Sequence, residues 1–519
     1  MKAGAKARGV LRAAAGILLC VVGFVLARAT PFRETTVIVD ATGCRLVTDI
    51  IDAGEDNVQG SVILLHGLAA NKKIMSYLAQ GFALLNLRVF VPDLPGHGRT
   101  PGPFSYARAE TCSDAFVRQL ITRGAVDPAR TILAGHSMGG ALAVRIGAHT
   151  PVAGAIAISP APMVAAPGVD ASMLIFTQPP TTPANTLVVS GSLEPRGVRD
   201  SARSLISGNE ATGKYMIIPG STHVSLLFDP QAARASQSWA EHVLKFEANA
   251  AVPSRIPLAG SMAGFFGILL LTGPFLRETL GKNSLLTGGE TTDTNDVTLT
   301  EPDAPVIMPL PLRAFLEIAM ASVAIVVLLR LSNPFGVLHV FGGDYLAGFL
   351  LILGVVLLLL HGRLVDSLWR VRPGPLLAAA FAAIVLPLLI YAWFDLTISE
   401  AWLTAPRWLR FPGLFAAVLP YHAAEELLLG PTRARFGKVR LLLALSFRAI
   451  AWGAWVGGIF VLHNGEILLL LLAPYFALFC LLQRTGMDVV RKGTGSPLAA
   501  ALFGAILLAG FCVVVFPIA

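Results

Sequence analysis

Apolar segments about as long as a bilayer is thick dominate the second half of the chain. Eight follow from about position 257, and each is near the ~20 residues that a helix needs to cross the hydrocarbon core. They cover residues 257–276, 312–331, 345–361, 375–394, 411–429, 441–462, 466–482 and 497–517. Only 14% of the 519 residues are charged, whereas soluble globular proteins have about 25%. We therefore predict an all-α polytopic transmembrane bundle over residues 257–519.

One stretch within this region has a different composition. Residues 281–306 are rich in acidic and small polar side chains and contain no aromatic residue. Such a segment cannot bury enough apolar surface to offset the entropy of ordering it. The sequence therefore predicts a disordered loop here.

The N-terminus predicts transfer of the following residues across a membrane. Lys2, Lys6, Arg8 and Arg12 precede the apolar run 13–27, and residues 27–29 fit the small-x-small pattern of a cleavage site. Residues 1–30 are thus predicted to be a signal anchor or a cleaved signal peptide. We favour the anchor, because the rest of the chain already carries membrane segments.

Basic residues between the apolar segments are unevenly distributed. With a cytoplasmic N-terminus, thirteen lie on the cytoplasmic side: Arg277, Lys282, Arg313, Arg363, Arg370, Arg372, Arg433, Arg435, Lys438, Arg440, Arg484, Arg491 and Lys492. Arg330, Arg407 and Arg410 lie on the other side. This positive-inside bias predicts a multi-pass cell-membrane protein whose residues 31–250 are extracytoplasmic. The net charge of +8 is then a topology signal, with the lipid bilayer and not nucleic acid as the partner.

Residues 31–250 have the pattern of a soluble α/β domain. Short apolar runs at 62–65, 89–91, 131–134, 155–158 and 187–189 alternate with helical stretches. Such runs are typical of strands buried on both faces of a mainly parallel sheet. Cys44 and Cys112 lie in this domain, where a disulfide is permitted outside the cytoplasm, although their spacing cannot establish one. We find no Cys/His spacing typical of a metal site.

Gly135-His136-Ser137-Met138-Gly139 is the motif that carries chemistry. It follows the predicted strand 131–134 and precedes a run, 141–148, that is compatible with a helix. A serine hydroxyl is a weak nucleophile until a base removes its proton, so it must stand on a sharp turn. Flanking glycines permit that turn, and the helix N-terminus favours developing negative charge.

Two further motifs follow in the order nucleophile, acid, histidine. Residues 187–194 read as a strand that ends in a turn with Glu194, and residues 215–219 as a strand that leads to His223. This order is the one found in α/β-hydrolases.

Residues 60–245 resemble the α/β-hydrolase superfamily, nearest its monoacylglycerol-lipase and serine-aminopeptidase-like branch. The motif Pro92-Asp93-Leu94-Pro95-Gly96-His97-Gly98-Arg99 is a landmark of that group. The resemblance implies that Ser137 is the nucleophile, His223 the base and Glu194 the orienting acid. It also implies that the backbone amides of Leu68 and Met138 form the oxyanion hole, and that no cofactor or metal takes part.

Alternatives to some of these roles remain open. The acid in this family is more often Asp, which leaves Asp200 as a competitor of Glu194. We expect His66 to support its loop, and His97 and His136 to stabilise turns.

The predicted bundle contains ionisable residues, and these define a second resemblance. Glu425-Glu426, His463 and residues 494–496 resemble in part the CAAX-protease-like intramembrane glutamic proteases. Gly430 stands where that family has an Arg, and the last apolar segment has no His or Asn. Arg448 falls at a similar depth to the glutamates, so an ion pair is the alternative.

These features predict a membrane-bound serine hydrolase that cleaves a small-molecule or lipid ester near the membrane surface. The rivals are a transport or binding protein with a non-catalytic hydrolase-like module, and an intramembrane protease with an accessory domain. Only about 25 residues separate Ser159 from the strand near Leu187. We therefore expect no inserted lid there, and an open, shallow site in the isolated domain.

Overall fold

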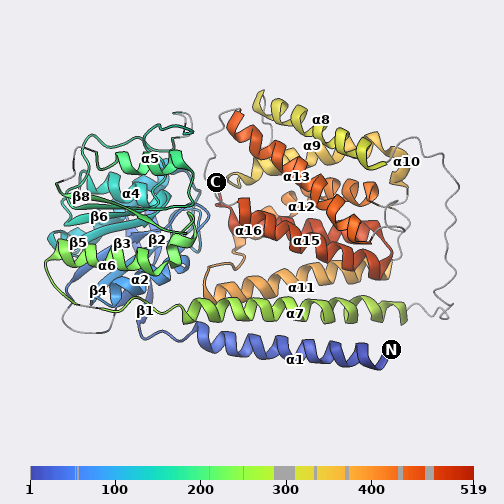
Figure 1. Ribbon diagram of the computed structural model, residues 1–519, viewed down its shortest axis with the longest axis horizontal. Helices are drawn as coiled ribbons and strands as arrows, with labels where there is room; N and C mark the ends of the chain where they lie inside the picture. Colours follow the sequence, from blue (N-terminus) through green and yellow to red (C-terminus); the bar gives the residue numbers. More distant parts are fainter. Residues whose placement is uncertain are drawn as a thin grey trace.

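The structure is a computed structural model that divides into a sheet domain and a helical bundle (Figure 1). It describes residues 2–519 except 53, 55–57, 170, 172–173, 208, 210, 249, 286–309, 332–335, 367, 369–372, 430–436 and 462–472. The sheet domain lies at one end of the helices (Figure 1). The first helix begins at the other end, and the C-terminus lies beside the sheet domain.

The sheet domain is built on one eight-stranded sheet with the order β1-β2-β4-β3-β5-β6-β7-β8. The strands are β1 Arg33–Ala41, β2 Cys44–Asp52, β3 Gly60–Leu65, β4 Leu87–Pro92, β5 Thr131–His136, β6 Gly154–Ile158, β7 Thr186–Gly191 and β8 Gly213–Ile218. β1 and β2 pair antiparallel, as do β2 and β4, and all remaining pairs are parallel. The five predicted apolar runs fall within β3 to β7, and the predicted strand 215–219 extends one residue beyond β8. The hairpin β1–β2 is an addition that the apolar runs did not predict.

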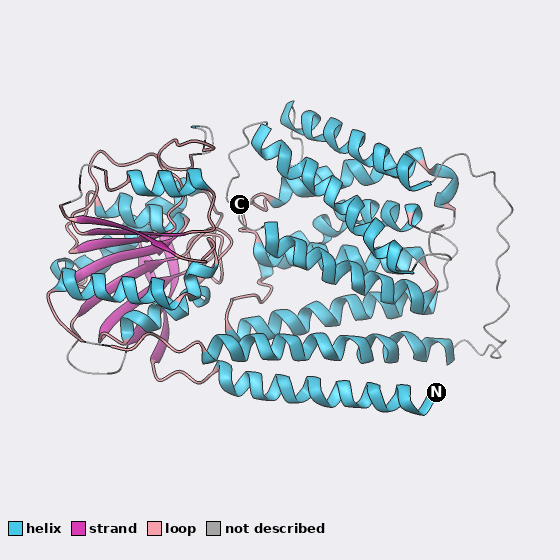
Figure 2. Ribbon diagram, viewed as in Figure 1, coloured by secondary structure: helices cyan, strands magenta, loops and turns pink. Residues whose placement is uncertain are grey.

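Helices cover both faces of this sheet (Figure 2). α2 (Ser76–Ala83) and α6 (Pro230–Leu244) pack on the face that carries Val62, Leu64 and Ile132. α3 (Tyr106–Thr122), α4 (Met138–Gly147) and α5 (Arg196–Ser204) pack on the face that carries Ile63 and Leu133. In the described connections lie the short 3-10 helices η1 Lys72–Met75, η2 Pro128–Arg130 and η4 Ser225–Phe228. Because successive side chains of a strand point to opposite faces, continuous apolar runs fill both cores.

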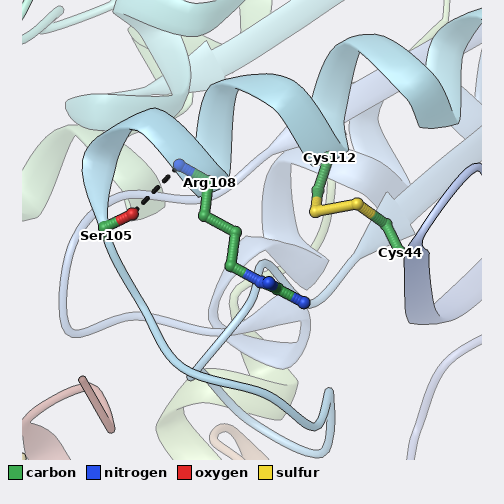
Figure 3. Close-up of a disulfide and its surroundings, with 4 residues drawn as sticks. All are labelled: Cys44, Ser105, Arg108 and Cys112. Atoms are coloured by element: carbon green, nitrogen blue, oxygen red, sulfur yellow. Dashed lines mark hydrogen bonds between the residues drawn. A yellow bond between two sulfur atoms is a disulfide. The ribbon is translucent and has the colours of Figure 1, made fainter.

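A disulfide joins Cys44, at the start of β2, to Cys112 in α3 (Figure 3). Their Cα atoms lie 5.5 Å apart. Ser105 caps the same helix, since its Oγ accepts a hydrogen bond from the amide of Arg108 at 3.1 Å. The bridge closes a loop of 68 residues between the sheet edge and α3, and so restricts the unfolded chain.

The helical bundle is formed by α1 Lys2–Ala27, α7 Ile256–Leu285, α8 Leu310–Leu331, α9 Gly343–Leu360, α10 Gly362–Val365, α11 Pro373–Thr397, α12 Ala405–Leu428, α13 Gly437–Val461, α15 Ala473–Thr494 and α16 Pro497–Val515. Seven described helices are long and apolar enough to cross a membrane: Gly9–Ala27, Ile256–Leu280, Arg313–Leu331, Gly343–Leu360, Pro373–Thr397, Leu441–Gly458 and Pro497–Val515. Six of the eight spans predicted from position 257 onward therefore correspond to one of these helices.

The other predicted segments differ from the structure. The segment 411–429 is helical within α12 but is not among these seven candidates. The segment 466–482 begins outside the described residues, and α15 extends beyond it to Thr494. α7 continues to Leu285, into the segment predicted to be a disordered loop. The rest of residues 281–306 lies outside the described part of the chain.

α1 packs closely against α7 through glycines. A Cβ atom on Gly23 would lie 2.6 Å from the carbonyl oxygen of Gly260, and one on Gly16 would lie 2.9 Å from that of Gly267. Such contacts allow two helix backbones to approach each other. The N-terminal helix is thus an integral part of the bundle surface.

The carboxyl ends of the parallel strands face the bundle. The loops after β3 and β4 contact bundle residues near positions 341, 400 and 518. Phe341 packs edge-on against Phe104, with ring centroids 5.0 Å apart. The amide of Ile518 donates to the carbonyl oxygen of Gly96 at 3.0 Å. This contact brings the edge of the sheet that carries the predicted site residues next to the helices.

Candidate active site

Ser137 occupies a tight turn between β5 and α4. Its φ is +55°, a left-handed value that is uncommon for a residue with a side chain. A Cβ on Gly139 would lie 2.1 Å from the carbonyl oxygen of Leu65, and one on Gly135 would lie 2.2 Å from that of Gly139. Only glycine therefore fits two residues before and two residues after Ser137, which explains the spacing of the motif.

His223 and Glu194 are brought together by the loops after β8 and β7. His223 Nδ1 lies 2.8 Å from Glu194 Oε1. The other oxygen, Oε2, accepts a hydrogen bond from the amide of Gly191 at 2.7 Å. Both side chains are buried. Asp200 lies instead on α5, where its carboxylate is 3.4 Å from Arg196. The geometry thus favours Glu194 over Asp200 as the partner of His223.

A small cavity of about 100 Å³ is shared by Ser137 and His223. Its lining is Leu68, Ala69, Ala70, Ile74, His136, Ser137, His223, Val224 and Leu227. Because His223 Nδ1 is hydrogen-bonded to Glu194, Nε2 is the ring nitrogen available to Ser137. Among the hydrogen bonds of the described residues, none joins Ser137 Oγ to His223. Such bonds are often long until substrate is bound.

The predicted oxyanion donors lie at this cavity. Leu68 lines it, and Met138 is the first residue of α4, directly after Ser137. A Cβ on Gly67 would lie 3.0 Å from Ser137 Cβ, so the backbone before Leu68 runs beside Ser137. The structure therefore brings the five predicted site residues to one edge of the sheet.

Comparison with known proteins identifies the fold. The family model of the Alpha/beta hydrolase family matches residues 62–265. The sheet domain, hereafter the hydrolase domain, has the alpha/beta hydrolase fold. The predicted fold class, a mainly parallel α/β domain joined to a helical region with several apolar helices, is confirmed.

Two curated relatives match part of the chain. The Magnesium-chelatase 30 kDa subunit of Rhodobacter capsulatus is 36% identical over 115 residues, which are 22% of this chain and 38% of that protein. The Monoacylglycerol lipase of Mycolicibacterium smegmatis is 34% identical over 113 residues, 21% of this chain and 39% of that protein. The chain thus spans about two fifths of the length of these relatives.

Solved structures also match part of the chain. An alpha/beta serine hydrolase without lid from Xanthomonas campestris is 17% identical, with a TM-score of 0.33, and the match covers 42% of this chain and 95% of that one. A carboxylesterase cloned from a metagenomic library is 16% identical, with a TM-score of 0.35, and the match covers 44% of this chain and 95% of that one.

Ser159 is a site residue that the sequence did not predict. It directly follows β6 with a φ of +46°. Its Oγ donates a hydrogen bond to Glu194 Oε1 and lies 2.6 Å from His223 Nδ1. Its position after a buried strand of the parallel sheet was the only available signal. Ser159 therefore holds the acid and the histidine on the side away from Ser137.

Three further histidines of the hydrolase domain are structural. The amide of Leu94 donates to His66 Nε2 at 2.9 Å, and His66 Nδ1 lies 2.8 Å from the carbonyl oxygen of Gly67. Burial lowers the pKa of His66 to about 4, and burial with the nearby His223 lowers the pKa of His136 to about 3. His97 Nε2 accepts a hydrogen bond from the amide of Ala69 at 3.3 Å. These side chains support the loops around the cavity, as expected.

The surroundings of Ser137 bear on the predicted absence of a lid. In the described residues between β6 and β7 there is no α-helix that could form a lid. Ser137 is only 3% exposed in the full chain, and Leu68, Ala69 and Ala70 of the loop after β3 line the same cavity. The open, shallow site was predicted for the isolated domain, whereas this exposure is that of the full chain, so it stays a prediction.

The glutamate pair of the bundle is neutralised by arginines. Arg448 Nε and Nη2 lie 2.7 Å and 2.9 Å from the two oxygens of Glu425. Arg484 Nη2 lies 2.5 Å from Glu426 Oε1. The ion pair expected with Arg448 is thus present, while His463 lies outside the described residues.

The described part of the chain holds no group of three or more His, Cys, Asp or Glu residues suited to a metal ion.

Proposed function

We propose that this protein is a membrane-bound serine hydrolase that cleaves carboxylic esters, including lipid esters, through an acyl-enzyme. The observation that carries the proposal is the shared cavity of Ser137 and His223, with His223 Nδ1 held by Glu194 at 2.8 Å. A nucleophile, a base and an acid in this relation are what acyl transfer requires.

The arrangement supports a two-step mechanism. His223 Nε2 accepts the proton of Ser137 Oγ while Oγ attacks the ester carbonyl carbon. The C–O bond to the alcohol then breaks, and His223 returns the proton to the departing oxygen. In the second step, His223 takes a proton from a water molecule while that water attacks the acyl carbon. The bond to Ser137 Oγ then breaks, Oγ takes the proton back, and the carboxylic acid product is released. Glu194 keeps the Nδ1 proton in place and stabilises the imidazolium that forms.

The oxyanion of each tetrahedral intermediate would be held by the amides of Leu68 and Met138. Met138 opens α4, so its N–H belongs to the unsatisfied first turn of a helix. Donors fixed before the reaction stabilise the developing charge without reorganisation, which is often the largest catalytic contribution.

Apolar walls support an acyl group as the bound part of the substrate. Leu68, Ile74, Val224 and Leu227 line the cavity around Ser137 and His223. The carboxyl edge of the sheet faces the bundle, so a lipid ester would reach the site from the membrane side. One relative is named a monoacylglycerol lipase, and a monoacylglycerol is an ester of this class.

A fluorophosphonate probe tests the function directly. We expect full-length protein in lipid to form one covalent adduct, on the peptide that contains Ser137, and to lose ester turnover in proportion to labelling. Labelling at another serine, or turnover that survives complete labelling, would refute the assignment. Absence of both labelling and turnover would favour the non-catalytic binding module, and peptide cleavage that resists the probe would favour the protease.

The hydrolase domain is proposed to lie outside the cytoplasm, with a retained signal anchor. The bundle residues that contact it, near 341, 400 and 518, fall in segments that the positive-inside pattern assigns to the extracytoplasmic side. The Cys44–Cys112 disulfide supports an oxidising compartment.

Reporter fusions check this orientation. We expect a phosphatase fused after residue 250 to be active and a cytoplasmic fluorescent reporter there to be dark. Fusions after residues 365 and 435 should show the inverse pattern. Fluorescence after residue 250 would reverse the proposed topology.

A further inference from the structure

One short segment of the bundle holds the loop that carries the oxyanion donor. The α11–α12 loop comprises residues 398–404, and the oxyanion loop comprises residues 66–72. Asn71 Nδ2 donates to Ser399 Oγ at 2.9 Å, and the amide of Glu400 donates to Asn71 Oδ1 at 3.1 Å. Asn71 therefore contacts the bundle at both ends of its amide group, three residues after Leu68.

A buried ion pair reinforces this contact. Lys72 Nζ lies 2.5 Å from Glu400 Oε1 and 2.9 Å from Asp49 Oδ2 of β2. The side chains of Lys72, Asp49 and Glu400 are 2%, 3% and 1% exposed. At such burial an ion pair is screened little by solvent, and loss of one partner leaves an uncompensated charge. Glu400 is thus one of two buried carboxylates that hold Lys72 in place, and it is the one that the bundle supplies.

The oxyanion loop is also tied to the loop after β4. The amides of Lys72 and Arg99 donate to the two carboxylate oxygens of Asp93, at 2.8 Å and 3.0 Å. Burial and the adjacent Glu400 raise the pKa of Asp93 well above its usual range. Arg99 Nε lies 3.3 Å from Glu400 Oε1. Glu400 therefore contacts both the oxyanion loop and the loop after β4.

The second loop has its own attachment to the bundle. Arg407, at the start of α12, donates through Nη2 to the carbonyl oxygen of Gly96 at 3.3 Å. Through Nη1 it donates to the carbonyl oxygen of Phe516 at 3.1 Å. The α11–α12 region thus fixes the two loops relative to the last helix of the chain.

We propose that Glu400 is a positioning residue for catalysis, which holds the oxyanion loop so that the Leu68 amide faces the tetrahedral intermediate. The inference rests on the proposed function. It makes turnover by the hydrolase domain dependent on the packing of α11 and α12, and links the bundle to the chemistry. Nothing in the sequence joins these residues, since Lys72 and Glu400 are 328 positions apart.

The test compares Glu400→Gln with a matched control in the full-length protein in lipid. Glu317→Gln is the control, because Glu317 also loses ion pairs, with Arg313 and His361, but does not touch the hydrolase domain. Turnover of a short ester is expressed per site titrated with a fluorophosphonate, which removes misfolded protein from the count. Ser137→Ala in the same membranes measures background.

A displaced oxyanion donor is expected to act on the transition state. We expect Glu400→Gln to lower kcat about 10- to 100-fold, with KM changed less than about threefold. Glu400→Asp, which keeps the charge, should recover part of kcat, and Glu317→Gln should resemble wild type. An unchanged kcat for Glu400→Gln, or an equal loss in Glu317→Gln, would overturn the inference while the proposed function stands.

Failure of the proposed function can be distinguished from failure of the inference about Glu400. Wild-type protein without Ser137-dependent turnover would refute the proposed function itself. If Glu400→Gln does not accumulate in the membrane, Ser399→Ala decides, because it removes only the hydrogen bond to Asn71. A fall in kcat of about threefold or more would then support the inference, and a wild-type kcat would refute it.

Discussion

Replacing Ser137 by alanine in the full-length protein is expected to lower ester turnover about 10⁴-fold or more. The alanine keeps the turn, because its side chain needs no more space than that of serine, but it leaves His223 with no hydroxyl to activate. Turnover of a chromogenic ester in lipid, with thermal unfolding followed in parallel, measures the effect. Substrate binding should persist, since the apolar walls of the cavity are unchanged.

Ser159→Ala is the matched control for this experiment. Ser159 is also a buried serine close to His223, but it lies beside Nδ1, which the acid already occupies. It cannot deliver a proton to Nε2, so its loss should lower kcat by about tenfold or less through poorer orientation of the pair. A larger loss in Ser159→Ala than in Ser137→Ala would exchange the roles of the two serines.

The strands of the hydrolase domain could be predicted because they are buried on both faces. The runs at 62–65 and 131–134 contain no charged residue, so burial and strand propensity agree. The hairpin β1–β2 escaped prediction because it forms the edge of the sheet. Most of β1 is exposed, and charged residues such as Arg33, Glu34 and Asp40 interrupt its apolar pattern.

The site was predictable only where short motifs carry it. Ser137, with its glycines, and the ends of β7 and β8 are local features of the chain. Ser159 and Glu400 are not, because their roles arise from contacts across the fold. Glu194 is 35 positions from Ser159, and no local pattern marks that pair.

The count of basic residues placed some side chains in loops that the structure buries in the bundle. Arg484 was assigned to a cytoplasmic loop, yet it is fully buried between Glu425 and Glu426. Arg407 was counted on the opposite side, where it is buried and caps the end of α16. A basic residue near the end of an apolar segment can therefore mark an internal ion pair or a helix cap as well as a loop.

Replacing Glu194 by glutamine is expected to lower kcat about 10³-fold or more. Glu194 accepts hydrogen bonds at both oxygens, from the amide of Gly191 on one side and from His223 and Ser159 on the other. A glutamine has only one acceptor oxygen, and its NH₂ group is a donor. With its oxygen on Gly191, its NH₂ group faces His223 Nδ1, which must then give up its proton. The proton moves to Nε2, and the base no longer accepts from Ser137.

Asp200→Asn is the matched control, since it makes the same chemical change in the competing acid. Asp200 is 39% exposed and pairs only with Arg196 on its own helix, among the described residues. An exposed pair of this kind contributes about 0–1 kcal/mol to stability, so kcat should stay within about twofold of wild type. Steady-state kinetics of both variants in lipid, with fluorophosphonate titration, gives the ranking. The reverse ranking would assign the acid to Asp200, and would require α5 to move its carboxylate to His223 during turnover.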